Sequence, residues 1–305
     1  MKDTIKKVPI PLCGVMLGMA ALGNLLQSYS EGARYVCGGV AGILLVLILL
    51  KVIMFPEMIR DDLKNPIMAS IAGTFPMALM LLSVYAKPLI GQAAYYIWIL
   101  AILLHIALMI YFTVKFVFRL QMPKVFASYY IIYIGIVVGS ITAPAYEKQG
   151  IGTALFWFGF AALLVLFVLV TIRYIKYKEV QEPAKPLICI YAAPVSLCVA
   201  GYVQSVTPKS YALLVGMYVA ACILYIFAFV KAVGYLKLPF YPSYSAFTFP
   251  FVISAIASKQ TMACLANMGR PLFALQYIVL FETIAAAVMV IYTLIRFGKF
   301  ILGKA

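Results

Sequence analysis

The chain contains ten apolar runs of about 20 residues, the length that one membrane-spanning α-helix needs. The runs cover approximately residues 8–28, 33–55, 66–85, 92–114, 123–144, 151–173, 184–205, 211–233, 240–258 and 271–295. With 66% hydrophobic and 11% charged residues, the chain lies far outside the soluble range of roughly 45–50% apolar and about 25% charged. The sequence predicts an all-α integral membrane protein with ten transmembrane helices, and its 305 residues leave no room for a soluble catalytic domain.

The number of basic residues alternates between high and low from one connection to the next, and this pattern predicts the topology. Of the 24 Lys and Arg residues, 18 fall on one side of such a bundle and 6 on the other. The smaller set comprises Arg34, Lys87, Lys148, Lys209, Lys259 and Arg270. Because cytoplasmic loops carry an excess of Lys and Arg, we expect both termini in the cytoplasm of a multi-pass cell (plasma) membrane protein. The net charge of +15 is explained by this bias, and we expect no nucleic-acid partner.

The chemistry-bearing residues do not form a catalytic or metal-binding pattern. The six cysteines, at positions 13, 37, 189, 198, 222 and 264, are scattered singly with no His at ligand spacing, and we interpret them as packing residues. The sequence has no H-E-x-x-H motif, no G-x-S-x-G motif and no intramembrane aspartate pair. We therefore expect neither an enzyme, nor a cofactor, nor a metal site.

Prolines reveal an internal repeat of one helical hairpin. A proline stands at the start of each odd-numbered run, and these five are separated by 57, 57, 60 and 56 residues: Pro9, Pro66, Pro123, Pro183 and Pro239. Such a fixed period is typical of repeat architectures. The sequence predicts a single transmembrane domain, residues 1–305, of five hairpins at approximately 8–55, 66–114, 123–173, 184–233 and 240–295.

The odd-numbered runs also carry residues that kink helices. We predict kinks at Pro76, Pro194 and Pro250 in three of them, and at Gly14, Gly18, Gly135 and Gly139 in the other two. A proline inside a helix frees a backbone carbonyl, which in lipid must find a partner in protein or water. We therefore expect the five odd helices inside, the five even helices facing lipid, and an axial pore with quasi-five-fold symmetry along the centre.

Hydroxyl residues collect on the same odd helices. We predict that the pore is lined by Ser70, Thr74, Ser128, Ser196 and Thr248. The alternative, for each position taken alone, is that a small residue merely permits close helix packing.

Two segments resemble a known family. Residues 9–22, PIPLCGVMLGMAAL, resemble the first helix of the tellurite-resistance/dicarboxylate transporter (TDT) family, and residues 246–250, AFTFP, are similar to its ninth-helix motif. That family includes TehA-like bacterial proteins and plant guard-cell slow anion channels. The resemblance implies a homotrimer in which each protomer has its own pore, closed midway by a phenylalanine that would be Phe249 here. The family mixes channels, malate carriers and sulfite exporters, so the resemblance leaves the substrate open.

A second aromatic residue occupies a similar place. Phe75 stands directly before Pro76 as Phe249 stands before Pro250, 174 residues later, which is close to three repeats. We predict Phe75 as a second pore aromatic. The alternative for both rings is packing between helices.

Intramembrane charge is confined to His105 and Glu282, both in even-numbered runs. An ionisable residue within a membrane indicates a functional role, here as a proton relay or gating sensor, and the alternative is a neutral, hydrogen-bonded side chain.

No Lys or Arg lies at mid-depth in an odd run, so the pore is predicted to be neutral. A neutral pore favours a passive channel for small monovalent anions, because a dicarboxylate carrier would need buried donors. A carrier or exporter of malate, sulfite or tellurite is the alternative.

Overall fold

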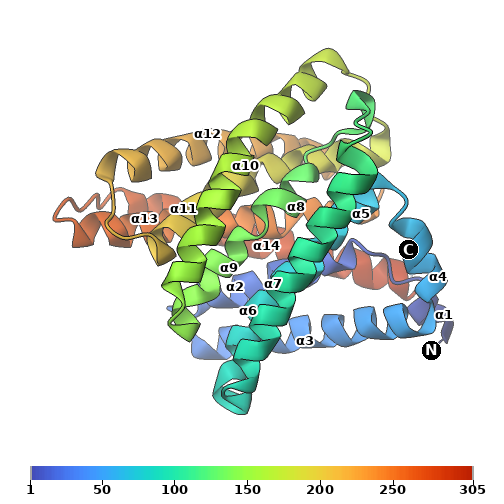
Figure 1. Ribbon diagram of the computed structural model, residues 1–305, viewed down its shortest axis with the longest axis horizontal. Coiled ribbons are helices and arrows are strands. Elements are labelled where there is room, and N and C mark those ends of the chain that lie inside the picture. The colour runs from blue at the N-terminus through green and yellow to red at the C-terminus, as the bar shows by residue number, and fades with distance from the viewer. Residues whose placement is uncertain (1, 304–305) are drawn as a thin grey trace.

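The computed structural model describes residues 2–303, which fold entirely into helices and their connections (Figure 1). Within this part of the chain, nine helices are long and apolar enough to cross a membrane, and the shorter apolar helix Leu12–Leu26 precedes them. The structure therefore has the ten spans that the sequence predicts, and the protein is a multi-pass membrane protein.

The five odd-numbered spans consist mostly of short segments. They are α2 (Leu12–Leu26); α5 (Pro66–Ala72) with α6 (Thr74–Ile90); α8 (Tyr129–Ile134) with α9 (Val137–Thr142) and η3 (Ala143–Tyr146); η4 (Glu182–Ala192) with α11 (Ala193–Ser205); and η5 (Pro242–Phe247) with α13 (Phe249–Asn267). The even-numbered spans are long single helices: α3 (Glu31–Met54), α7 (Ala93–Phe112) extended by η1 (Thr113–Val117), α10 (Gln149–Lys176), α12 (Tyr211–Tyr235) and α14 (Leu275–Ile301). Short helices α1 (Lys2–Lys6), α4 (Pro56–Asp62) and η2 (Met122–Lys124) lie in the connections.

The segment boundaries follow from proline and glycine. Pro76, Pro194 and Pro250 lie in the first turn of α6, α11 and α13, where a missing backbone N–H costs no hydrogen bond. In the fifth span the break between α8 and α9 falls at Gly135 and the following residue. Four of the five odd-numbered spans are thus divided into segments, and α2 is the exception.

Three predicted kink positions do not interrupt their helices. Helix α2 runs unbroken past Gly14 and Gly18, and Gly139 lies inside α9. Each of these glycines instead allows a close approach: an added Cβ would lie 2.6 Å from Thr248 Cβ at Gly18, and 2.6 Å from Leu155 Cδ1 at Gly139. Their role in the structure is packing.

Burial separates the spans into two rings. In the third, fifth, seventh and ninth spans, 67% to 89% of the most apolar 18-residue stretch is buried, against 28% to 39% in the even-numbered spans. Helix α2 buries 13 of its 15 residues. The prediction of an inner ring of odd spans and an outer ring of even spans is confirmed.

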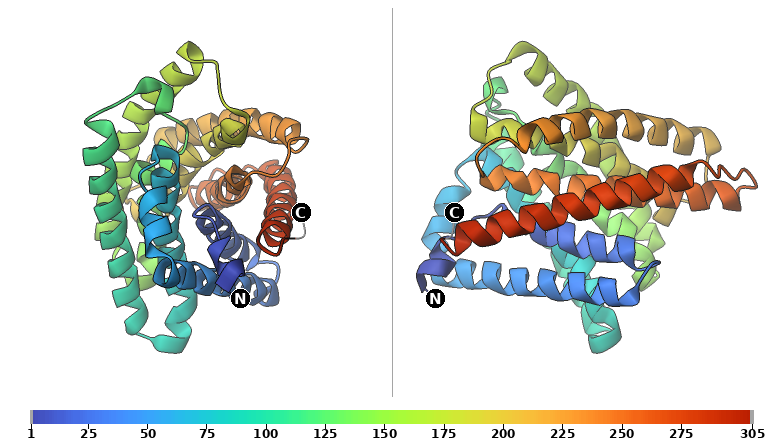
Figure 2. Two further views of the ribbon diagram at one scale, coloured as in Figure 1. Left: turned by 90° about the vertical axis from the view of Figure 1, so that its right-hand side faces the viewer. Right: turned by 180° about the vertical axis from the view of Figure 1, so that it is seen from behind.

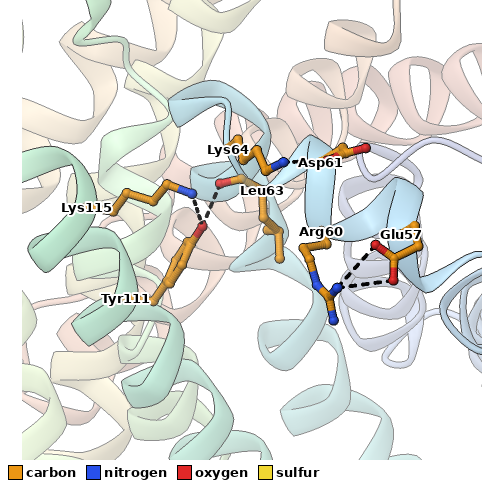
Figure 3. Close-up of polar contacts among 7 residues, drawn as sticks. All are labelled: Glu57, Arg60, Asp61, Leu63, Lys64, Tyr111 and Lys115. Atoms are coloured by element: carbon orange, nitrogen blue, oxygen red, sulfur yellow. Dashed lines mark hydrogen bonds and ion pairs between the residues drawn. The ribbon is translucent and has the colours of Figure 1, made fainter.

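Both chain ends lie at one end of the bundle, here called the termini end (Figure 2). A Cβ added to Gly303 would come within 3.1 Å of Lys7 Nζ. The connection around α4 lies at the same end, and its Leu63 carbonyl accepts a hydrogen bond of 3.0 Å from Tyr111, whose hydroxyl accepts one of 2.6 Å from Lys115 (Figure 3). The opposite end, with the turns between odd and following even spans, is called the far end.

Two solvent-exposed ion pairs lie in this connection. Lys64 donates to Asp61 at 2.7 Å, and Arg60 donates to Glu57 at 3.1 Å (Figure 3). The hydrogen bond from Lys64 lowers the pKa of the Asp61 carboxyl. Because these pairs are solvent-exposed, they contribute little to stability.

Candidate functional site

A small cavity lies on the axis of the bundle, towards the termini end. All five odd spans line it, for example through Gly14, Thr74, Gly135, Pro194 and Phe249, and no even span contributes a lining residue. None of its lining residues is charged. It offers about 40 Å³ to the centres of water-sized molecules, where one water needs roughly 10–15 Å³. The inner ring therefore encloses a narrow, neutral, axial space.

A second cavity lies on the far side of the first. It offers about 270 Å³ and is lined by α2, α6, α9 and α13, with the polar residues Asn24, Lys259 and Gln260 in its wall. Phe249 is the one residue that lines both cavities. The Phe249 side chain thus stands between two spaces on the bundle axis.

The environment of Phe249 differs from that of its neighbour Phe251. Phe251 is fully buried, and its ring centre lies 5.7 Å from that of Tyr225 and 6.3 Å from that of Phe229. Phe249 instead lines both cavities. Phe251 is a packing residue, and Phe249 is a cavity-lining residue.

Thr248 holds the backbone just before Phe249. Its dihedral angles, φ −98° and ψ −95°, lie outside the helical region, so the chain bends between η5 and α13. Its Oγ1 lies 2.9 Å from the Gly14 carbonyl oxygen and 2.7 Å from that of Ser245, so its one O–H is shared between these two acceptors. Since Gly18 lacks a side chain, α2 can lie directly against this bend.

The predicted pore hydroxyls divide into two groups. Thr74 lines the axial cavity, although its Oγ1 donates to the Ile71 carbonyl at 2.7 Å. The others join inner helices to one another: Ser70 donates to Ser128 at 2.7 Å, and Ser196 lies 3.1 Å from the Ser254 hydroxyl. Together with Thr248, these serines lie outside the cavity lining, where their hydrogen bonds are made within the protein. A cavity-lining hydroxyl outside the predicted set is Ser245.

Phe75 does not reach the axis. Thr74 and Met77 are the cavity-lining residues at this level of α6, whereas Phe75 is half-buried and packs against the hydrophobic core. The motif before each proline is the same, but the third span breaks at Gly73, one residue before the threonine, and the ninth breaks at the threonine itself. Gly73 keeps helical dihedral angles, φ −57° and ψ −21°, whereas Thr248 does not, so the chain bends before Phe249 but not before Phe75, which lies outside the cavity lining.

The two intramembrane ionisable residues lie outside both cavities. His105 is fully buried, and its Nε2 lies 2.9 Å from the Ile132 carbonyl oxygen. Glu282 is 3% exposed and accepts a hydrogen bond of 2.5 Å from Ser258 on α13. Each therefore connects an outer helix to an inner one.

Lys259 is a site residue that sequence reasoning missed. It lines the far cavity, and its Nζ donates to the Leu25 carbonyl at 3.1 Å and to the Ser28 hydroxyl. The sequence does indicate this position, because Lys259 follows Phe249 by only ten residues and so belongs to the same odd-numbered span. Because Lys259 was assigned only to a connection between spans, its position in the wall of the far cavity was not predicted.

The cysteines take no part in this site: all six are free, and none lines either cavity. Within residues 2–303, no group of three His, Cys, Asp or Glu side chains is placed to hold a metal ion.

Comparison with known proteins adds the family. No match was found among curated proteins. The family model SLAC1, voltage-dependent anion channel, matches residues 7–297, which covers the first nine spans in full and α14 up to residue 297. This is the same family as the one that residues 9–22 and 246–250 resemble. The match over nearly the whole chain, on a ten-span bundle with an axial cavity, means that the chain belongs to the SLAC1 voltage-dependent anion channel family.

Proposed function

We propose that the axial cavities form the conduction path of a passive channel for small monovalent anions, and that the Phe249 ring closes this path. The observation that carries the proposal is the position of Phe249 in the walls of both cavities. An apolar ring in a narrow, neutral passage excludes water and so raises the barrier to an ion, as in hydrophobic gating. Displacing this ring would join the two spaces.

The lining favours small anions over dicarboxylates. The cavity at the termini end contains no charged residue, and its space of about 40 Å³ holds a few waters at most. A dicarboxylate carrier would be expected to hold both carboxylates with Arg or comparable donors. Weak solvation by a hydroxyl such as that of Ser245, which lines the cavity, suits a channel, whose binding must be loose enough for release.

The charge distribution supports anion entry. The chain carries a net charge of +15, and Lys259 lies in the wall of the far cavity. Such a field raises the local anion concentration without tight binding. In a plasma membrane with the termini in the cytoplasm, an anion gains about 2.3 kcal/mol per 100 mV by leaving, so net flow is outward.

The family resemblance supports a homotrimer with one pore in each protomer. We expect crosslinking in mild detergent to saturate at trimers, and saturation at dimers would contradict this assembly.

Truncation of the ring tests the gate. Purified Phe249→Ala protein in liposomes should pass chloride and nitrate at least about tenfold faster than wild type, equivalent to about 1.4 kcal/mol off the barrier. Phe251→Ala is the matched control. It also removes a phenylalanine ring, two residues further along α13, but that ring is packed against other side chains. That control should lose stability, by about 3–5 kcal/mol, without gaining flux.

Two outcomes would contradict the proposal. If folded Phe249→Ala protein shows wild-type flux, Phe249 does not close the path. If it carries malate or sulfite but neither chloride nor nitrate, the carrier or exporter alternative replaces the channel.

A further inference from the structure

A long groove runs along the lipid-facing surface between α10 and α12. Two adjoining hollows, of about 780 and 650 Å³, share the lining residues Phe167, Ile223 and Leu224 and so form one groove. Figure 1 shows why it exists: α10 is steeply inclined to α12, so the two outer helices do not close over the inner helix between them. That inner span, η4 and α11, forms the floor through Ile188, Tyr191 and Val195.

The termini end of the groove is basic. Lys178, Lys185 and Lys231 line it, and no acidic residue does. Within residues 2–303, none of these three lysines forms a salt bridge. The hydroxyl-bearing residues Thr171 and Tyr235 lie in the same wall. The groove therefore presents unneutralised positive charge, together with hydrogen-bonding groups, at the level of a membrane surface.

The remainder of the groove is apolar. Its far half is lined by residues such as Leu163, Val168, Gly216 and Met217, without a charged side chain. From Lys231 to Gly216 is a distance of 15 residues on α12, about 22 Å at 1.5 Å per residue. This exceeds half of a hydrocarbon core of about 30 Å, so the groove has the length of an acyl chain.

We propose that this groove is a binding site for an anionic phospholipid, with its phosphate at Lys178, Lys185 and Lys231 and an acyl chain along Phe167, Ile223 and Leu224. The charge complementarity favours this occupant: basic pockets between membrane helices at the cytoplasmic side bind anionic headgroups. An ammonium pairs with phosphate through charge-assisted hydrogen bonds. The zwitterionic lipids of the same bilayer present a compensating positive charge and fit the three lysines less well.

The floor of the lipid groove is also a wall of the axial cavity. Leu187 and Ile190 of η4 line the cavity, whereas Ile188 and Tyr191 of the same segment line the groove. The Tyr191 ring centre lies 5.4 Å from that of Tyr130, a cavity-lining residue. A lipid in the groove therefore contacts the back of the inner ring.

Lipid-dependent thermal stability tests the site independently of transport. Phosphatidylglycerol titrated into the detergent-solubilised full chain should raise Tm by several degrees, and phosphatidylcholine should not. In the triple variant Lys178→Gln, Lys185→Gln, Lys231→Gln, the midpoint of the phosphatidylglycerol titration should rise at least about tenfold, because each surface lysine adds to the attraction. The matched control replaces Lys115, Lys237 and Lys299, three lysines outside the groove, and should keep the wild-type midpoint.

A second pair of variants tests the apolar half. An added Cβ meets nothing within 4 Å at Gly216 or at Gly298, so Gly216→Leu fills the groove and Gly298→Leu serves as its control on α14. Gly216→Leu should weaken lipid binding while the oligomer stays intact, and Gly298→Leu should change neither.

Several results would overturn the lipid site. They are an equal response to both lipids, an equal loss in the control triple variant, or full stabilisation by soluble glycerol phosphate, which lacks acyl chains. Loss of the oligomer in Gly216→Leu would assign the groove to a second copy of the chain.

Discussion

Ser258 of α13 joins the inner ring to two outer helices. Its hydroxyl donates to Glu282 on α14 at 2.5 Å and accepts from Tyr218 on α12 at 3.2 Å. All three residues are buried, and none lines either axial cavity. A carboxyl that is hydrogen-bonded in this way needs no transport role, because buried polar groups in membrane helices commonly serve as links between them.

We expect Glu282→Gln to leave anion flux at the wild-type level, because the amide oxygen also accepts a hydrogen bond from Ser258. The loss of stability should stay within the range of about 0.5–1.5 kcal/mol for one hydrogen bond. Liposome flux and thermal unfolding of the purified protein measure the two effects. Abolished flux in a folded, fully assembled variant would instead indicate a proton-coupled carrier.

Lys259 should increase anion supply to the far cavity. Replacing it with Gln should reduce chloride flux several-fold at low ionic strength, and the difference should shrink near 1 M salt, where the Debye length falls to about 3 Å. The effect is best measured in the Phe249→Ala background, where flux is high. Lys148→Gln, an exposed lysine that lines neither cavity, is the control with the same charge change. An equal reduction in both variants would mean that only net charge matters.

At the scale of helices, prolines made the inner ring predictable, but they did not fix which side chains face the axis. A proline marks where a helix segment starts. The orientation of its neighbours depends on where the preceding segment ends, at Gly73 in one span and at Thr248 in another. Phe75 and Phe249 therefore differ in position despite identical motifs. Likewise, Ser70 and Ser128 looked suited to a pore, but their hydroxyls bond each other between helices, a pairing set by tertiary contact.

The contact between α2 and α13 gives a test at this scale. Gly18→Ala would place a Cβ 2.6 Å from Thr248 Cβ and 3.1 Å from the Phe249 backbone nitrogen. Because backbone cannot yield as a flexible side chain does, we expect a loss of about 1–3 kcal/mol and an increased anion leak as α13 shifts.

Gly42→Ala on α3 is the control, since an added Cβ there meets nothing within 4 Å. It should match wild type in flux and should not lower Tm, because Ala favours a helix over Gly. If Gly18→Ala equals wild type in both flux and Tm, the close approach of the two helices does not hold the ring in place.

At the scale of the whole molecule, the fold was the most predictable feature, because each span must satisfy its backbone hydrogen bonds and match the bilayer thickness. Ten apolar runs and their prolines specify the number of spans and the two rings. The site was less predictable: the two cavities depend on the depth at which four of the inner spans break, and the lipid groove depends on the crossing of α10 and α12. Neither quantity is local to a short sequence.

The orientation in the membrane is the prediction that belongs to this scale. Both termini lie at the same end of the bundle, and the sequence assigns 18 of the 24 basic residues to that end. Since Lys and Arg are retained on the cytoplasmic side during insertion, we expect the termini end to face the cytoplasm. A reporter fused to the C-terminus should be active only in the cytoplasm, and one inserted next to Lys148, at the far end, only outside. An external signal from the C-terminal fusion would invert the bundle, and the three groove lysines would then face the outer leaflet.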